Sequence, residues 1–103
     1  MRGSATGRPV MALLDLLGRR WALRVLWELR DGPLGFRALQ AACDQMSPTV
    51  LATRLGELRT AGLVETDPAG VNQLTSLGSE LGEALHPLRT FAVRWATELT
   101  DSL

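Results

Sequence analysis

Apolar residues recur every three or four positions along the first third of the chain, a spacing typical of amphipathic helices. The first such stretch begins at Pro9, and an interruption at Gly18 separates it from a second stretch. An Asp-Gly-Pro turn at 31–33 ends the second stretch, because glycine and proline terminate helices. The apolar positions are Val10, Leu13, Leu14 and Leu17 in the first predicted helix, and Trp21, Ala22, Val25, Leu26 and Leu29 in the second.

Two further helices are predicted, with a very short connection between them. A short extended link at 34–36 leads into a two-turn helix that ends at Cys43, and residues 44–46 connect it to the next helix. Ser47 is a good N-cap, since its hydroxyl can accept a hydrogen bond from an amide of the first turn. Pro48 follows at the first helical position, where its missing N–H costs nothing. Two helices joined so closely indicate a helix-turn-helix.

The helix that begins at Pro48 has two contrasting faces. Met46 precedes the cap and is expected to pack on the inward face, and Gly62 supplies a stop. The inward face is Leu51, Leu55 and Leu58, and the outward face is Thr49, Ala52, Thr53 and Gly56. Such a helix can be held from behind while its small-residue face lies in the major groove of DNA. An ordinary surface helix is the alternative, but a glycine inside a helix costs ~1 kcal/mol relative to alanine.

The hydrophobic period changes after Gly62. Residues 63–66 read as a strand, residues 67–70 have turn chemistry, and residues 71–74 read as a returning strand. The predicted fold class is therefore mainly α with a small β-hairpin. A helix-turn-helix over about 36–61, followed directly by a wing over about 63–74, is a winged helix-turn-helix.

A long last helix is predicted over about 76–100, capped by Thr75 or Ser76 and kinked by Pro87. Its apolar stripe exposes more surface than a small core can cover. We expect the distal part of this stripe to pair with the first helix in a homodimer, whereas packing within one chain is the alternative. The predicted dimer interface is Val10, Leu13, Leu14, Leu17, Leu88, Phe91, Trp95 and Leu99.

Length and charge refine this picture. The chain has 103 residues and a net charge of zero, and we expect one domain over 9–103 after a flexible leader over 1–8. Residues 19–59 hold seven arginines against four acidic residues, a net of +3, whereas residues 60–103 hold two against six, a net of −4. The basic part contains the helix-turn-helix. Every cationic side chain is arginine, which suits bidentate contacts to phosphate or guanine, although a compositional bias toward arginine explains this equally well.

Other classes of function find little support. No apolar run approaches the ~20 residues that span a membrane, and the amino terminus lacks the apolar segment of a secretory signal. A single cysteine, Cys43, excludes an internal disulfide framework and fits the reducing cytoplasm. The single histidine, His86, precedes Pro87 and has no companion that would form a catalytic pair or metal site. We therefore expect neither an enzyme nor a bound cofactor or metal.

Several motifs, taken in order, resemble those of HxlR-type regulators, a winged helix-turn-helix group related to the MarR regulators. The resemblance covers about residues 8–99. It implies a cytoplasmic, homodimeric transcription factor, often a repressor. Such a factor binds a pseudo-palindromic operator in double-stranded DNA. The motifs are Leu14-Asp15-Leu16-Leu17-Gly18-Arg19-Arg20-Trp21, Gly32-Pro33-Leu34-Gly35-Phe36-x-x-Leu39, Ser47-x-x-Val50-Leu51-x-x-Arg54-Leu55-x-x-Leu58-x-x-Ala61-Gly62-Leu63-Val64, and Leu74-Thr75-x-Leu77-Gly78.

The chain departs from this group at three places. Many relatives carry a redox-sensing cysteine directly before the proline of the first helix, where this chain has Arg8. Relatives usually have a basic residue before Phe36, where this chain has Gly35. Their wing is longer and basic, whereas the turn at 67–70 is short and acidic. Thiol sensing is therefore not expected, and the wing is predicted to read the minor groove poorly.

Together these features predict a sequence-specific DNA-binding regulator. Thr49, Ala52 and Thr53 are expected to meet base edges, and Arg37, Ser47 and Arg54 to hold phosphates. The predicted DNA-binding residues are Arg37, Ser47, Pro48, Thr49, Ala52, Thr53 and Arg54. One alternative is a dimeric protein-interaction module that no longer binds DNA. Another is a regulator that senses a small molecule of unknown identity, with Trp21, Trp27 or Trp95 lining its pocket.

Overall fold

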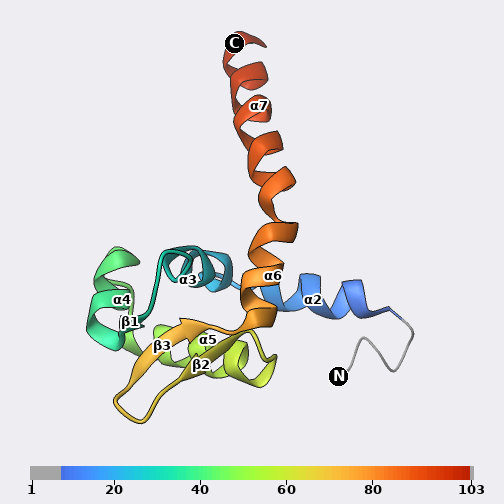
Figure 1. Ribbon diagram of the computed structural model, residues 1–103. Coiled ribbons are helices and arrows are strands. Elements are labelled where there is room, and N and C mark those ends of the chain that lie inside the picture. Colours follow the sequence, from blue (N-terminus) through green and yellow to red (C-terminus); the bar gives the residue numbers. More distant parts are fainter. Residues whose placement is uncertain (1–7, 103) are drawn as a thin grey trace.

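The computed structural model describes residues 8–102, and the side chains of residues 8–101. The leader expected over 1–8 lies outside the described residues, apart from Arg8. Helices dominate, and short strands lie between them (Figure 1). The elements in chain order are α2 (Pro9–Leu17), α3 (Ala22–Glu28), β1 (Leu34–Gly35), α4 (Phe36–Ala42), α5 (Pro48–Thr60), β2 (Val64–Thr66), β3 (Val71–Leu74), α6 (Ser76–Ala84) and α7 (His86–Ser102).

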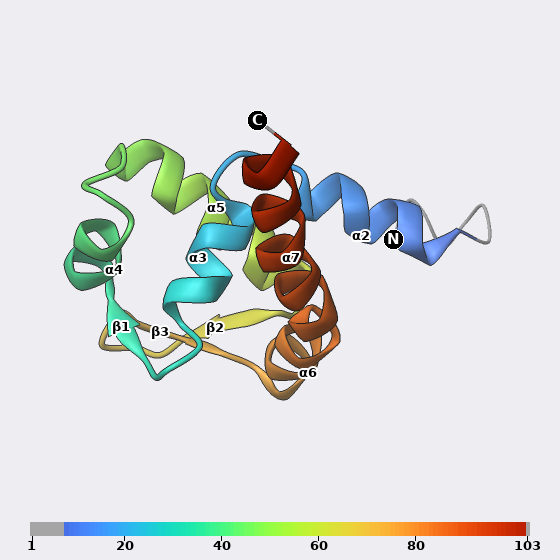
Figure 2. The ribbon, with the colours of Figure 1, turned by 90° about the horizontal axis from the view of Figure 1, so that it is seen from above.

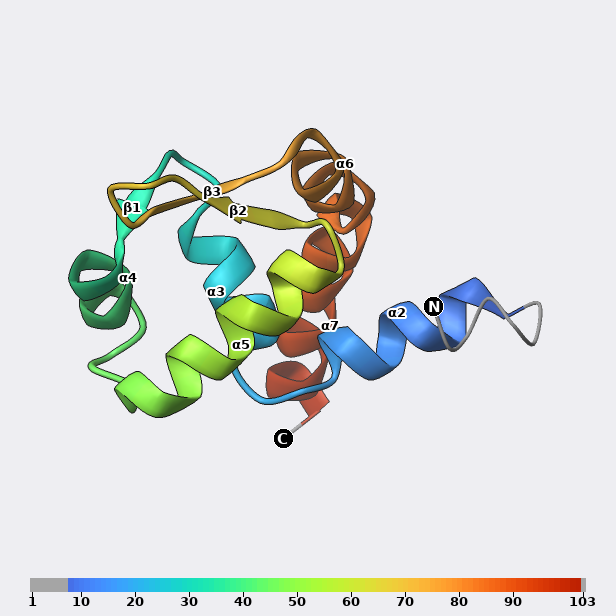
Figure 3. The ribbon, with the colours of Figure 1, turned by 90° about the horizontal axis from the view of Figure 1, so that it is seen from below.

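The core lies between α3, α4 and α5 on one side and the sheet on the other (Figure 3). The inward stripe of α5, namely Leu51, Leu55 and Leu58, is almost completely buried, and Met46 joins the same cluster. Burial of one such leucine contributes roughly 2 kcal/mol to stability. This confirms the inward face predicted for α5, and φ of +77° at Gly62 confirms the predicted stop.

The sheet has three strands, one more than the predicted hairpin. Its order is β1-β3-β2, and both pairs are antiparallel, with Leu34 opposite Asn72 and Val64 opposite Leu74. The segment that the sequence indicated as an extended link therefore adds a strand to the wing. Two residues are too few to show the alternation that identifies a strand. The buried Asn72 stabilises this pairing, because its Nδ2 donates to the Leu34 carbonyl at 3.2 Å.

The second helix begins one residue later than its apolar pattern indicated. Trp21 adopts the left-handed region, with φ of 77°, and α3 starts at Ala22. A left-handed non-glycine residue costs roughly 1–2 kcal/mol. The half-buried Trp21 ring packs against the core and holds the backbone there. Packing of the Trp21 ring thus fixes the connection between α2 and α3. The spacing of apolar residues in the sequence does not predict this packing.

The predicted long last helix is two helices, with Leu85 between them. Pro87 lies in the first turn of α7, where its missing N–H leaves no hydrogen bond unmade. Proline therefore starts a second helix here, rather than kinking one continuous helix at its middle. Helix α7 projects from the body, and its residues from Thr90 to Asp101 are all exposed (Figure 1). None of the helices in the described range is long and apolar enough to cross a membrane.

Candidate nucleic-acid interface

The start of α5 is built by a tight and well-bonded turn. Asp44 and Gln45 both adopt left-handed φ, at 58° and 57°, and Gln40 Nε2 donates to the Met46 carbonyl at 2.9 Å. The Ser47 hydroxyl accepts from the Val50 amide at 3.3 Å, so the predicted N-cap is confirmed. These contacts hold the first turn of α5 at the surface with a fixed orientation relative to α4.

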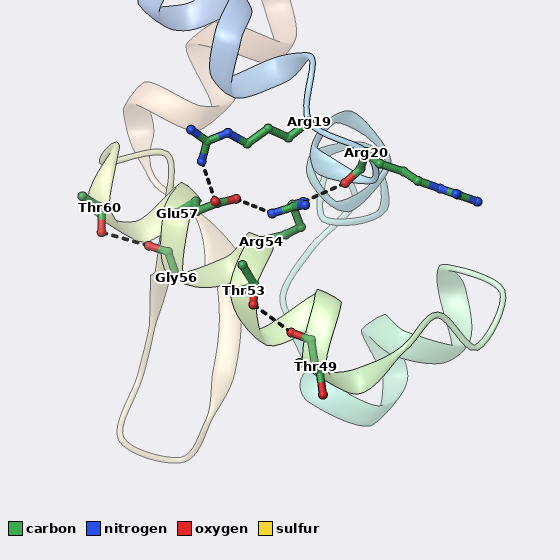
Figure 4. A network of polar contacts seen from close by, with 8 residues as sticks. All are labelled: Arg19, Arg20, Thr49, Thr53, Arg54, Gly56, Glu57 and Thr60. Carbon is green, nitrogen blue, oxygen red and sulfur yellow. Dashed lines mark hydrogen bonds and ion pairs between the residues drawn. The ribbon is translucent and has the colours of Figure 1, made fainter. Parts of the chain in front are cut away.

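The outward face of α5 does not present its hydroxyls equally. Thr49, Ala52 and Thr53 are all exposed. The Thr53 hydroxyl donates to the Thr49 carbonyl at 3.0 Å, whereas the Thr49 side chain points away from this network (Figure 4). Within the described chain the Thr49 hydroxyl makes no hydrogen bond. Thr49 therefore offers a free donor and acceptor, and Thr53 offers mainly its methyl group.

Arg54 makes contacts that the sequence did not indicate. Its Nε donates to the Arg20 carbonyl at 2.8 Å, and its Nη1 contacts Glu57 Oε1 at 2.7 Å (Figure 4). Arg19 forms an ion pair with the same Glu57 carboxylate. The Arg54 side chain is only 20% exposed. Arg54 thus joins α5 to the connection between α2 and α3.

Arg37 is the freer cation beside this helix. It is exposed on α4, and no acidic or carbonyl partner is found for it in the described part of the chain. Arg37 and Pro48 line one shallow hollow of about 500 Å³, which places this guanidinium next to the start of α5. An exposed arginine without a partner in the described chain can reach a DNA phosphate from this place.

The small-residue face of α5 also borders a groove. Ala52, Thr53 and Gly56 line a volume of about 1010 Å³ between α2, α5 and α6. Only part of this face therefore lines the groove: Gly56 does, and Thr49 does not. Sequence periodicity could place these residues on one side of α5, but not show that another helix lies beside part of that side.

Asp67, the acidic residue of the wing turn, makes its hydrogen bonds within the turn. Asp67 Oδ1 accepts from the amides of Ala69 and Val71, each at 2.9 Å, and so fixes the turn. Arg59 Nη1 donates to Thr66 Oγ1 at 3.0 Å and joins α5 to β2. The turn is thereby shaped by its own carboxylate, and it presents no cation.

The residues predicted for a dimer interface separate into two groups. Leu17 is 7% exposed and belongs to the core, and Leu13 packs against that core. Leu17 therefore has little surface left for a partner, because that side of α2 faces the core. The others are exposed: Val10 and Leu14 on α2, and Leu88, Phe91, Trp95 and Leu99 on α7.

Reactive groups are few. Cys43 is fully buried, as the sequence indicated, and this burial raises the pKa of its thiol. In the described chain, no cluster of three or more His, Cys, Asp or Glu side chains could hold a metal ion. Arg8 directly precedes Pro9 and is the N-cap residue of α2, where its side chain makes no cap hydrogen bond.

These features define a winged helix-turn-helix protein: a helix pair joined by a tight turn, a short wing behind it, and flanking helices at both ends. Comparison with known families agrees. Residues 16–100 match the HxlR-like helix-turn-helix family, and the chain belongs to it. The family consists of transcriptional regulators, so the chain is a regulator of helix-turn-helix type.

Individual relatives support this assignment. The chain is 32% identical over 90 residues to YvaP of Bacillus subtilis (strain 168), an uncharacterized HTH-type transcriptional regulator, covering 85% of this chain and 83% of the relative. The quinone-bound YodB of B. subtilis superposes with a TM-score of 0.79 at 28% identity, covering 84% of this chain and 97% of YodB. A MarR-family regulator of Enterococcus faecalis V583 gives a TM-score of 0.79 at 27% identity, covering 90% of each chain.

Proposed function

We propose that the chain is a homodimeric repressor that reads a pseudo-palindromic operator in double-stranded DNA, in the cytoplasm, with the exposed start of α5. One observation carries the proposal: Thr49 presents an unbonded hydroxyl on the first turn of a capped, rigidly held helix. A recognition helix contacts bases with the residues of its amino-terminal half. A hydroxyl can bond to either kind of base edge in the major groove.

The predicted contacts divide into base reading and positioning. Thr49 reads a base edge, while Ala52 and the methyl group of Thr53 contact a thymine methyl. Ser47 and Arg37 hold phosphates, and Pro48 packs against the sugar-phosphate backbone at the same end of the helix. Phosphate contacts set the register of the protein on the duplex and do not themselves read sequence.

Arg54 takes a different role from the one that its charge suggested. Two of its donors are already used within the chain, and releasing them would leave the Arg20 carbonyl and Glu57 without this partner. We therefore propose that Arg54 positions α5 rather than binding phosphate. Likewise the wing contributes shape and little affinity, because Asp67 closes the turn and presents no cation.

Dimerisation supplies the second recognition helix. Leu88, Phe91, Trp95 and Leu99 recur at helical spacing on α7, and each is close to half exposed. Apolar stripes of this kind mark interaction surfaces in proteins. The exposed side of α2 adds Val10 and Leu14. We propose that a two-fold axis through these helices sets the two copies of α5 on half-sites about one turn of DNA apart, as in other helix-turn-helix dimers.

Titration against duplex DNA at several salt concentrations tests this proposal. A duplex selected from random sequence should bind far more tightly than a scrambled duplex. Thr49→Val keeps the side-chain shape and should cost on the order of 1 kcal/mol at one base position per half-site, with the salt dependence unchanged. Arg37→Ala should weaken binding to every sequence and lower the salt slope by about 0.9 per lost phosphate contact.

Failure would take a specific form. If the unmodified chain binds no duplex even at low salt, the protein-interaction alternative replaces DNA binding. The net charge of zero and the acidic wing turn favour that alternative. Retention on heparin that falls steeply with salt would instead agree with phosphate binding.

A further inference from the structure

A second cleft lies on the other side of α6 from the groove beside α5. It has a volume of about 640 Å³ and is bounded by α3, α6 and the start of α7, elements that lie beside one another in the view from above (Figure 2). This volume falls in the range of small-molecule sites, roughly 300–1,000 Å³. Leu26, Leu81 and Leu85 supply apolar walls.

An aromatic ring and two guanidinium groups meet in this cleft. Trp27 is 39% exposed, so part of its side chain lies outside the core. The guanidinium carbon of Arg30 lies 3.6 Å from the ring centroid, and that of Arg89 lies 5.0 Å from it. Arg30 lies in the turn after α3 and Arg89 lies on α7, and the fold brings both to one indole.

The arginines of the cleft differ in how many of their N–H donors already have partners. Arg24 forms ion pairs with Glu28 and Asp44. Arg30 Nη2 lies 3.5 Å from Asp31 Oδ2, and its Nη1 donates to the Trp27 carbonyl.

Arg89 has far less. It is half-buried, and the one hydrogen bond that its side chain makes to a described residue is a long one, from Nη2 to the Gly82 carbonyl at 3.4 Å. Glu83 also lines the cleft, but it makes no ion pair with Arg89. A guanidinium has five N–H donors in a planar fork that matches a carboxylate. Arg89 therefore retains unused donors in the lining of a cleft whose walls are partly apolar and partly charged.

We propose that this cleft binds a small aromatic carboxylate, with its ring against Trp27 and the apolar walls and its carboxylate on Arg89. Such a site goes beyond DNA binding, and it concerns Trp27 alone among the three tryptophans that the sequence offered as pocket residues. A bound ligand would contact α3, inside the helix-turn-helix domain, and α7, the helix proposed for dimerisation. Binding to the cleft can be measured without DNA, so its failure is distinguishable from failure of the DNA-binding proposal.

Calorimetric titration of the full chain with 2-naphthoate tests the site. Two matched compounds separate its requirements: 2-naphthamide keeps the ring and removes the charge, and octanoate keeps the charge and removes the ring. We expect saturable binding of 2-naphthoate, and about tenfold weaker binding of each control, as loss of one charge-assisted hydrogen bond or stacking contact implies.

Variants assign the contacts. Arg89→Gln should weaken 2-naphthoate about tenfold while leaving 2-naphthamide unchanged, and Trp27→Leu should weaken both. Arg94→Gln is the matched control, because Arg94 is an exposed arginine of α7 outside the cleft. Circular dichroism checks that each variant is folded.

The comparison of the three compounds needs only the unmodified chain and stands even if a variant misfolds. The proposal is overturned if 2-naphthoate shows no saturable binding at millimolar concentration, as would occur if a second copy covered the cleft. Equal affinity for 2-naphthoate and 2-naphthamide would also overturn it, since the carboxylate would then have no partner.

Discussion

At the scale of single residues, Gly78 shows why α6 begins where it does. A Cβ at this position would lie 2.1 Å from the backbone oxygen of Leu63, a distance that no side chain tolerates. The amide of Gly78 donates to the Thr75 hydroxyl at 3.0 Å and caps the helix. Close approach of backbone to backbone is what allows α6 to pack against the end of α5 and the start of the wing.

This contact predicts opposite outcomes for two glycines of the same helix. Gly78→Ala should lower the free energy of unfolding by about 1–3 kcal/mol, because the backbone must move apart. Gly82→Ala should leave stability unchanged or raise it by up to about 1 kcal/mol, since its Cβ would meet nothing within 4 Å and alanine favours a helix. Urea denaturation of both variants makes the comparison, and equal effects would contradict it.

Cys43 provides a second prediction at this scale, through pH. Burial raises the pKa of its thiol in the folded chain, so the folded state holds the proton more tightly than the unfolded state does. Stability is then fully present below the unfolded pKa of about 8.5 and is lost as pH rises toward the folded pKa. The chain has no tyrosine or lysine, so no other side chain titrates normally in this window.

Urea denaturation between pH 8 and pH 10 should show this loss in the unmodified chain. The slope can reach about 1.4 kcal/mol per pH unit for one group. Cys43→Ala should show a flat profile over the same window, after a uniform offset for the lost packing. A slope that survives the substitution would assign the titration to another group, such as the terminal amine.

At the scale of elements, the contacts of Arg54 and Glu57 determine how α5 is held. Arg54 bonds to the Arg20 carbonyl, and Glu57 receives both Arg54 and Arg19. The connection after α2 is thereby tied to the helix proposed to enter the major groove. A change in the position of α2 would be transmitted to α5 through these side chains, because they link the two elements directly.

Arg54→Ala should lower the free energy of unfolding by about 1 kcal/mol, the typical net value of a hydrogen bond. The DNA affinity of the Arg54→Ala variant should also fall. Its salt slope, the change of log affinity with log salt concentration, should equal that of the unmodified chain, whereas Arg37→Ala should lower it. Arg59→Ala is the matched control for stability, since Arg59 is exposed and its side chain makes one hydrogen bond within the described chain, to the Thr66 hydroxyl. A salt slope lowered by about 0.9 in Arg54→Ala would return Arg54 to the phosphate contacts.

At the scale of the whole molecule, α7 extends from the body without cover along most of its length (Figure 1). The overall extents of 50 × 37 × 23 Å reflect this projection. Trp95 and Leu99 lie toward its free end, and both remain about half exposed. Most of the stability of a helix in a protein comes from packing of its apolar face, so we propose a second copy as the source of such contacts for α7.

The unmodified chain should therefore be a dimer at tens of micromolar in light scattering. Trp95→Glu should give a monomer, because it places a charge in the centre of the apolar stripe. Val93→Glu is the matched control, since Val93 is 71% exposed and lies on the opposite side of α7 by helical spacing. A stable monomer for the unmodified chain would remove both the dimer and the paired half-sites.

The sequence by itself determined the winged helix-turn-helix class, the cap at Ser47 and the buried face of α5. These depend on local spacing and on the chemistry of single residues, which a linear pattern records directly. The linear pattern did not predict β1, which is too short to have a period. It also did not predict the break between α6 and α7, because the position of Pro87 permits either a kink or a new helix.

Tertiary structure alone decided the rest, because the outcome depended on which neighbours the fold supplies. Arg54 on α5 and Arg37 on α4 carry the same charge, yet of these two only Arg54 hydrogen-bonds a carbonyl and a carboxylate. Leu14 and Leu17 share one amphipathic pattern, yet only Leu17 faces α3 and the core. Charge and hydrophobicity are properties of a residue. The number of its hydrogen-bond partners and its burial depend on its surroundings.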